Sequence, residues 1–191
     1  PECLNIFTDK WGPAVQEDPS LKLRKHQEQA ISYAKERQSY VVTTGTGSGK
    51  SLCFFIPIID AAIRAKKAGG GARTRAIVIY PMNALANSQA KELEGYLGSA
   101  TDGMVTYARY TGQESAEDRE LIKANPPDIL LTNFMMLELL MTRQSDLDRK
   151  VLQNCEGLQF IVLDELHTYR GRQGADVAML MRRLRSRIGD P

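Results

Sequence analysis

Short apolar runs alternate with stretches of helical periodicity along most of the chain. Two of these runs, residues 77–79 and 160–163, are apolar at every position, as strands buried on both faces are. Three more runs are rich in β-branched or aromatic residues. Together the runs predict five strands, at Tyr40–Thr43, Ala76–Tyr80, Met104–Tyr110, Ile129–Thr132 and Leu158–Leu163.

The segments between these runs carry apolar residues at helical spacing. Pro57 falls inside one of them and should kink that helix without ending it, because Ile58 and Ile59 continue the apolar face. The predicted helices are Leu21–Gln38, 49–67, Asn83–Leu97, Ser115–Ala124, Phe134–Thr142, a short polar helix around Asp146–Gln153, and a last helix that starts after Gly174 and runs to about Ile188.

Strands that alternate with helices predict an α/β fold, with a mostly parallel sheet covered by helices on both faces. Residues 1–20 predict an irregular lead-in, and residues 21–191 a single domain, since 191 residues hardly suffice for two. In such sheets ligands bind beyond the carboxyl ends of the strands. Functional residues are therefore expected directly after the predicted strands.

Composition narrows the class of protein without fixing its function. The chain is 42% hydrophobic and 25% charged, and a net charge of +2 is too small to indicate a polyanion partner by itself. Cys3, Cys53 and Cys155 lack paired spacing, which disfavours a zinc site or a disulfide framework and fits a reducing, intracellular (cytoplasmic or nucleoid) compartment. The longest apolar run, Leu52–Ile59, is too short to span a membrane, and no membrane partner is expected.

A glycine-rich turn lies between the first predicted strand and a helix-like segment. Its residues Thr44–Ser51 read Thr-Gly-Thr-Gly-Ser-Gly-Lys-Ser. Glycines let the backbone amides converge on a phosphate, and the helix N-terminus adds partial positive charge. Lys50 would then reach the β- and γ-phosphates, and Ser51 would place a hydroxyl on Mg²⁺. Thr44 stands where the common phosphate-loop pattern has glycine. The alternative is an ordinary glycine-rich turn that Lys50 and Ser51 follow by chance.

An acidic pair follows the last predicted strand. Asp164 would hold the Mg²⁺ of a bound nucleotide, and Glu165 would orient and deprotonate the attacking water. Alone, such a pair is most often a solvated strand end. Both this pair and the loop at Lys50 fall at carboxyl ends of predicted strands. We therefore expect Lys50, Asp164 and Glu165 to meet at one magnesium-bound triphosphate.

Several motifs, in order, resemble the first RecA-like, ATP-binding domain of superfamily 2 helicases of the DExH/DEAD-box kind. The resemblance covers roughly residues 21–188. The amino-acid sequences of segments 80–86 and 164–171 most resemble those of large helicase-related and mitomycin-repair-type DNA helicases. The matching segments are 23–27, similar to the Q motif, 44–51, 80–89, similar to motif Ia, 110–112, similar to motif Ib, 131–133, and 164–167.

The resemblance implies ATP and Mg²⁺ as cofactors and assigns roles residue by residue. Gln27 would read the adenine edge, and its amide can both donate and accept there. His167 would link the nucleotide to a second RecA-like domain. The phosphate tail would be held by Thr46, Gly47, Ser48, Gly49, Lys50 and Ser51.

The resemblance also implies a nucleic-acid face, with DNA favoured over RNA. Small and hydroxyl residues suit phosphate contacts that ignore sequence. The expected residues are Pro81, Asn83, Thr111, Gly112, Thr132 and Asn133. Each has a plainer alternative: Asn83 and Asn133 as helix caps, and Thr111-Gly112 as a turn. Methionines 135, 136 and 141 are interpreted as core residues, and the arginines of the last helix as a solvated face.

The family resemblance implies a second RecA-like domain that this chain does not contain. We expect the amino-terminal half of a motor, which hydrolyses ATP poorly alone because an arginine supplied in trans is worth about 10³–10⁵ in rate. Two other functions stay open. One is a nucleotide-gated nucleic-acid clamp, and the other is a duplex-translocase subunit of a defence or restriction complex.

Overall fold

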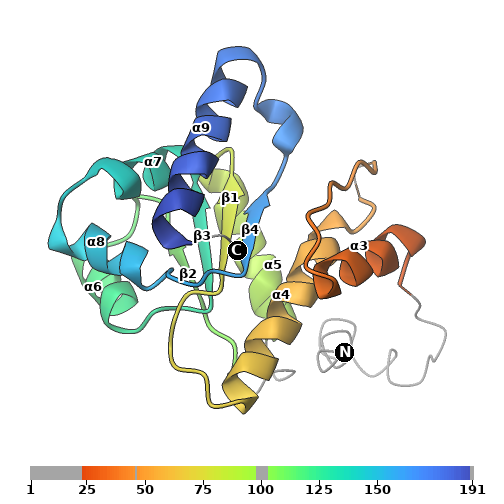
Figure 1. Ribbon diagram of the computed structural model, residues 1–191, viewed down its shortest axis with the longest axis horizontal. Coiled ribbons are helices and arrows are strands. Elements are labelled where there is room, and N and C mark those ends of the chain that lie inside the picture. Colours follow the sequence, from red (N-terminus) through yellow and green to blue (C-terminus); the bar gives the residue numbers. More distant parts are fainter. Residues whose placement is uncertain (1–22, 46, 98–102, 190–191) are drawn as a thin grey trace. The chain divides into compact units, whose positions relative to one another are not determined.

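The computed structural model describes residues 23–45, 47–97 and 103–189 (Figure 1). The chain divides into two compact units, and each is described on its own. The first consists of Pro1–Gly70 with Leu93–Val105, and the second of Gly71–Glu92 with Thr106–Pro191. The predicted lead-in at 1–20 lies outside the described residues.

The first unit is built on two helices that pack against each other, α3 (Lys25–Lys35) and α4 (Lys50–Lys67). Helix α4 continues past Pro57, as the apolar residues after it predict. Phe55 of α4 is fully buried, and its ring lies 6.1 Å from that of Tyr96. No helix in the described ranges has both the length and the apolar character needed to cross a bilayer.

The predicted strand at Tyr40–Thr43 is wrong, because these residues adopt no regular secondary structure. Tyr40 is tied to the helices of its own unit instead: its ring stacks on Tyr33, and its hydroxyl donates to the Cys53 carbonyl at 2.7 Å. Val41 is 71% exposed, so the β-branched run is not buried on both faces. The prediction rested on composition alone, whereas in the structure the Tyr40 side chain, rather than strand pairing, holds this segment.

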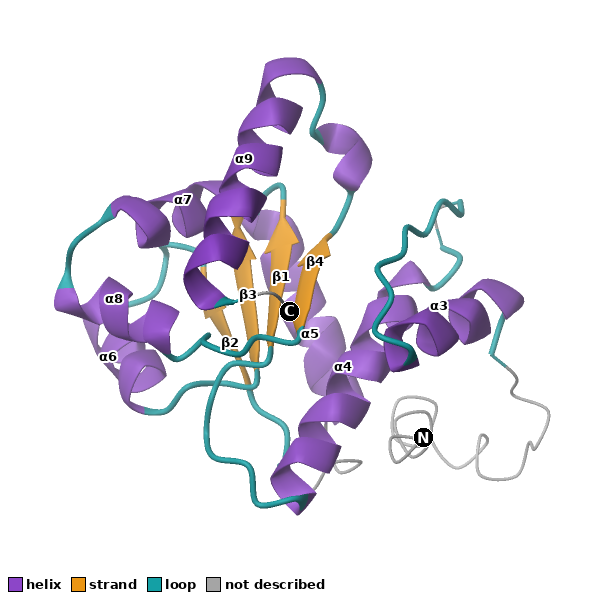
Figure 2. Ribbon diagram, viewed as in Figure 1, coloured by secondary structure: helices purple, strands orange, loops and turns teal. Residues whose placement is uncertain are grey.

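The second unit contains a four-stranded parallel sheet, which confirms the predicted α/β fold (Figure 2). The strands are β1 (Ala76–Tyr80), β2 (Tyr107–Tyr110), β3 (Ile129–Asn133) and β4 (Phe160–Leu163). Their order in the sheet is β2-β3-β1-β4, and Val78 of β1 lies between Leu131 of β3 and Val162 of β4. Strands β2 and β4 are shorter than the predicted Met104–Tyr110 and Leu158–Leu163.

The helices are α5 (Asn83–Leu97), α6 (Ala116–Ala124), α7 (Phe134–Thr142), α8 (Asp146–Gln153) and α9 (Gly171–Ile188), with a 3₁₀ turn η2 (Leu166–Thr168) before α9. The bounds predicted for α5, α7 and α8 are confirmed. Helix α9 begins before Gly174, contrary to prediction. A Cβ at Gly174 would come within 2.9 Å of the Tyr169 carbonyl oxygen, so this glycine allows a close approach rather than breaking the helix.

One apolar core joins the sheet to α6, α7, α8 and α9, which lie beside the strands in Figure 1. Alternate residues of the strands face it, among them Ile77, Ile79 and Leu130. A buried ion pair fixes the start of β1: Arg75 Nη1 lies 2.6 Å from Asp128 Oδ1, and both side chains are 1% exposed. The core holds the carboxyl ends of β1, β2 and β3 in register.

Candidate functional site

The turn at 44–51 leads directly into the N-terminus of α4. The Lys50 ammonium donates to the carbonyls of Thr44 at 2.9 Å and Gly45 at 3.1 Å, and the hydroxyls of Thr44 and Ser48 are 2.6 Å apart. Gly47 has a φ of +71°, and a Cβ built there would meet nothing within 4 Å. Glycines in the turn, the space around Gly47 and a lysine at a helix N-terminus fit a phosphate tail. Thr46 lies outside the described residues.

Helix α3 holds the end of this turn through Gln27 and His26. The Gln27 amide donates to the Gly49 carbonyl at 3.0 Å, and its oxygen accepts from the Arg24 amide at 2.9 Å. His26 Nε2 lies 3.1 Å from the Ser48 carbonyl oxygen. Gly49 has a φ of +75°, which favours glycine, and a Cβ there would approach Gln27 Nε2 to 2.7 Å and have to displace it. Gln27 thus positions the turn with a side chain that is only 5% exposed.

The acidic pair lies directly after β4 in the second unit. Asp164 continues the ladder, since its amide donates to the Ile79 carbonyl at 3.0 Å. Its carboxylate accepts from the Glu165 amide at 2.9 Å. Glu165 has a φ of +48°, a left-handed conformation that is strained for this residue type and is typical of functional sites. His167 Nδ1 lies 3.1 Å from Glu165 Oε2.

Two buried tyrosines have raised pKa values, because of burial and of the nearby charge of Asp164. Burial, followed by the charge of Asp164, raises the pKa of Tyr169 to about 12. Burial, with smaller effects of Asp164 and Glu92, also raises the pKa of Tyr80. Neither hydroxyl has a hydrogen-bond partner in the part of the chain that the structure describes. Both therefore stay protonated beside the acidic pair at neutral pH.

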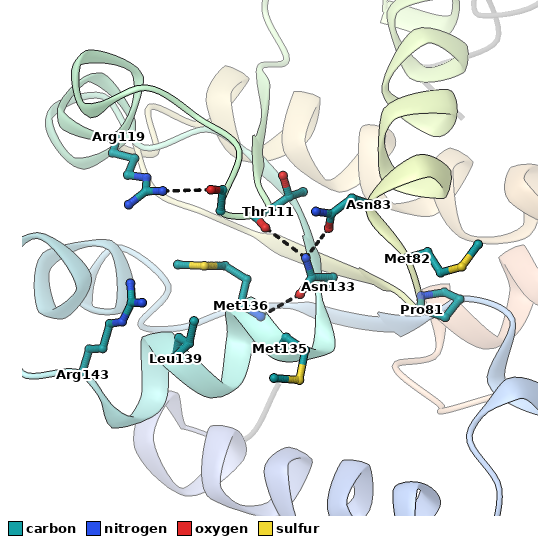
Figure 3. Close-up of a pocket in the computed structure, with 11 residues that line it drawn as sticks. Pro81, Met82, Asn83, Thr111, Arg119, Asn133, Met135, Met136, Leu139 and Arg143 are labelled. Carbon is teal, nitrogen blue, oxygen red and sulfur yellow. Dashed lines mark hydrogen bonds between the residues drawn. The ribbon is translucent and has the colours of Figure 1, made fainter.

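A pocket of about 440 Å³ opens at the carboxyl ends of β1, β2 and β3 (Figure 3). Five of the six residues expected on the nucleic-acid face line it, although they come from three separate segments: Pro81, Asn83, Thr111, Gly112 and Asn133. The sixth, Thr132, does not reach it. Its side chain is fully buried, and its hydroxyl donates to the Tyr110 carbonyl at 2.7 Å, tying β3 to β2.

Asn133 connects the three walls of this pocket. Its amide nitrogen donates to the Asn83 side-chain oxygen and to the Thr111 carbonyl, the latter at 3.1 Å. Its amide oxygen accepts from the Met136 amide at 2.7 Å and caps α7 (Figure 3). The alternative of a helix cap is therefore correct for Asn133, and the same side chain also positions Asn83 and Thr111.

Six lining residues were not predicted: Met82, Arg119, Met135, Met136, Leu139 and Arg143. Met135 is 66% exposed, so its interpretation as a core residue is wrong, whereas Met136 is buried. Met135 and Leu139 are four residues apart, which places them on one face of α7, and Arg143 follows at the same interval just past the end of the helix. That spacing was the signal that could have identified them.

A carboxylate sits against the Thr111-Gly112 turn. Glu114 Oε2 accepts from the amides of Thr111 at 2.8 Å and Gly112 at 2.9 Å, and Oε1 accepts from the Thr111 hydroxyl at 2.8 Å. Burial alone would raise the pKa of the Glu114 carboxyl, but these hydrogen bonds outweigh it and lower the pKa. Glu114 is therefore ionised at neutral pH.

Comparisons with known proteins agree with one another. A family model described as DEAD/DEAH box helicase matches residues 24–190. The uncharacterized ATP-dependent helicase YprA of Bacillus subtilis is 32% identical over 164 residues, which are 86% of this chain and 20% of YprA. The chain thus spans about a fifth of the length of the curated relative it matches.

Two solved structures are similar in both fold and sequence. The helicase Lhr of Mycobacterium smegmatis, bound to ssDNA and AMP-PNP, aligns with a TM-score of 0.74 and 26% identity, covering 87% of this chain and 21% of that one. The DUF1998 helicase MrfA, bound to DNA and AMPPNP, aligns with a TM-score of 0.72 and 28% identity, covering 100% of this chain and 26% of that one.

Proposed function

The chain belongs to the DEAD/DEAH box helicase family, and from that premise we propose that it is the ATP-binding half of an ATP-dependent nucleic-acid helicase. The substrate we propose is DNA, because the relatives Lhr and MrfA are bound to DNA. The proposal includes a second RecA-like domain as partner and an intracellular location.

We assign the nucleotide to the turn before α4 and to the acidic pair after β4. ATP with Mg²⁺ supplies the phosphoryl group that passes to water. Lys50 exchanges its two loop carbonyls for phosphate oxygens, with Gly47, Ser48 and Gly49 lending backbone amides and Thr46 included from the sequence. Gln27 holds the turn while it reads adenine. Ser51 and Asp164 suit Mg²⁺, which prefers one or two protein oxygens in addition to phosphates.

Glu165 is the group that we assign to proton transfer. A carboxylate acts as general base when it is held within hydrogen-bond reach of the water that it deprotonates. Its left-handed backbone and its contact with His167 give that side chain a defined direction. His167, 67% exposed, has a free face with which to contact a second domain.

One observation carries the nucleic-acid half of the proposal: five residues expected on that face line a single pocket. The pocket adds two arginines, Arg119 and Arg143, to neutral donors such as Thr111 and Gly112. Guanidinium groups and backbone amides bind phosphates without reading bases. Asn133 acts as a positioning residue here, since its amide groups are committed to Asn83, Thr111 and Met136. We infer that Thr132 supports this face from beneath rather than contacting the strand.

The experiment is an unwinding assay with the full-length protein. The substrate is a DNA duplex with a single-stranded tail, with ATP and Mg²⁺ present. Lys50→Ala should reduce unwinding by about 10²–10³-fold, because it removes a charge that stabilises the transferring phosphate. It should leave binding of the single-stranded tail intact, since Lys50 is assigned to the nucleotide.

The control is Lys35→Ala, which removes an exposed lysine at the end of α3 and should unwind like the wild type. Undiminished unwinding by Lys50→Ala would overturn the assignment. Movement along DNA without strand separation would favour the duplex translocase. The nucleotide-gated clamp is not favoured, because a clamp without turnover has no need of Glu165.

A further inference from the structure

The contacts of Glu114 single it out in the second unit. Its carboxylate is held by two successive backbone amides, those of Thr111 and Gly112, and by the Thr111 hydroxyl, at 2.8–2.9 Å. Three donors therefore converge on one anion. Gly112 has a φ of +92°, the left-handed conformation that occurs in turns whose successive amides converge on an anion. Successive amides arranged in this way form a nest that binds anions such as phosphate.

The charge state of Glu114 supports this interpretation. The hydrogen bonds hold its pKa below the ordinary value despite partial burial, so the group is a carboxylate at neutral pH. The geometry thus shows what the Thr111-Gly112 turn prefers: a negatively charged oxygen. Charge-assisted bonds of this kind are shorter and stronger than bonds between neutral groups.

Thr111 and Gly112, the residues that hold Glu114, also line the pocket assigned above to the nucleic-acid backbone. Arg119 flanks them: its Nη2 donates to the Gly112 carbonyl at 3.2 Å, and its buried Nε has no hydrogen-bond partner among the described residues. A phosphate attracted by this guanidinium would approach the amides that Glu114 already occupies. One N–H cannot donate in full strength to both anions.

We propose that Glu114 is an internal stand-in for a nucleic-acid phosphate, which closes the Thr111-Gly112 nest until a backbone phosphate displaces it. This inference rests on the proposed function. Only molecules in which the nest is open can bind a phosphate there. The apparent affinity for the strand is therefore the intrinsic affinity multiplied by the fraction of molecules with an open nest. A strand therefore displaces Glu114 only when its other contacts in the pocket supply the free energy that this displacement costs.

A different role predicts the opposite behaviour. If Glu114 only shapes the turn and stays in place when the strand binds, loss of its charge loosens the turn and weakens binding. The sign of the change in affinity therefore separates a displaced group from a structural one.

The test is binding of a fluorescein-labelled single-stranded DNA to the full-length protein, measured by fluorescence anisotropy without nucleotide. Glu114→Gln keeps the shape and removes the charge, and its Kd should fall about 3- to 10-fold because the nest opens more often. The matched control is Glu117→Gln, which removes an equal charge from the exposed first turn of α6. It should change Kd by less than about twofold, since exposed charges are screened.

A double mutant locates the effect. In a Thr111→Val background the gain from Glu114→Gln should largely disappear, because the two changes act on the same nest. If Glu114→Gln does not fold by circular dichroism, Glu114→Asp replaces it, since the shorter side chain loosens the same bonds and should also lower Kd.

Equal or weaker binding by Glu114→Gln overturns the inference. If the wild type binds the strand, this result leaves the proposed function standing. If neither protein binds, both fall. Binding by Glu114→Gln alone would support the inference in its strongest form.

Discussion

At the scale of single residues, Arg75 and Asp128 show how completely a charge can be enclosed in this fold. Asp128 Oδ1 pairs with Arg75, and Oδ2 accepts from the amide and hydroxyl of Thr106 at 2.9 and 3.0 Å. The pair therefore links the starts of β1 and β3 to the segment that precedes β2. A buried ion pair is hardly more stabilising than a pair of apolar residues of similar volume would be. Removing one partner is nevertheless costly, because the other charge stays buried without a counter-charge.

Asp128→Ala should lower the free energy of unfolding by about 3–5 kcal/mol, because Arg75 stays buried without its partner. Urea denaturation followed by circular dichroism measures this change. The exposed pair between Lys123 and Glu120 is the control, and Glu120→Gln should cost less than about 1 kcal/mol. Equal effects at the two sites would contradict the account of the buried pair.

Glu114 predicts a pH dependence of stability. Its pKa is lowered from 4.5 in the folded protein, so its stabilising effect is complete above that value and is lost as the pH falls through the lower folded value. Glu114→Gln cannot titrate there. The difference in unfolding free energy between wild type and variant should therefore shrink as the pH drops below about 4.5. Urea denaturation at a series of acid pH values measures it, and a constant difference would refute the assignment.

At the scale of elements, α7 both begins at the pocket and forms one of its walls. Asn133→Asp keeps an oxygen that caps α7 but loses the donor to Asn83 and Thr111. We expect single-stranded DNA affinity to fall about tenfold, because an unpaired polar group remains at the junction. Anisotropy titration measures this, and wild-type affinity would show that the junction does not position the pocket.

Ser145→Ala is the matched control for that variant. Ser145 caps α8 through the Asp148 amide, so its loss should cost about 1 kcal/mol of stability. Because α8 does not line the pocket, DNA affinity should not change. A fall in affinity here would mean that helix stability in general, rather than Asn133, controls binding.

The bounds of α7 and α8 were predictable from sequence because each helix has a local signal in its capping side chain, Asn133 for α7 and Ser145 for α8. The run at Tyr40–Thr43 has the composition of a strand but is anchored through the Tyr40 side chain, which no periodicity reveals. Likewise Gly174 serves a close approach that only coordinates show. Local chemistry was predictable, and partners distant in sequence were not.

At the scale of the whole molecule, the resemblance to a first RecA-like helicase domain is confirmed by the family match and by the related structures. Sequence motifs predicted five of the eleven lining residues of the pocket because residues after parallel strands meet at one edge of the sheet. They did not predict Arg119, which lines the pocket from α6, or Glu114, whose carboxylate accepts from the Thr111 and Gly112 amides. The roles of Lys50, Asp164 and Glu165 stay proposals that activity must test.

The most direct test is the rate of ATP hydrolysis by the full-length protein, with and without single-stranded DNA. We predict stimulation by DNA, and for Glu165→Gln a loss of about 10²–10⁴-fold, the usual contribution of a general base. Binding of a fluorescent ATP analogue should persist in that variant. Hydrolysis at the full rate without DNA, or undiminished turnover by Glu165→Gln, would contradict the account of an ATP-driven motor.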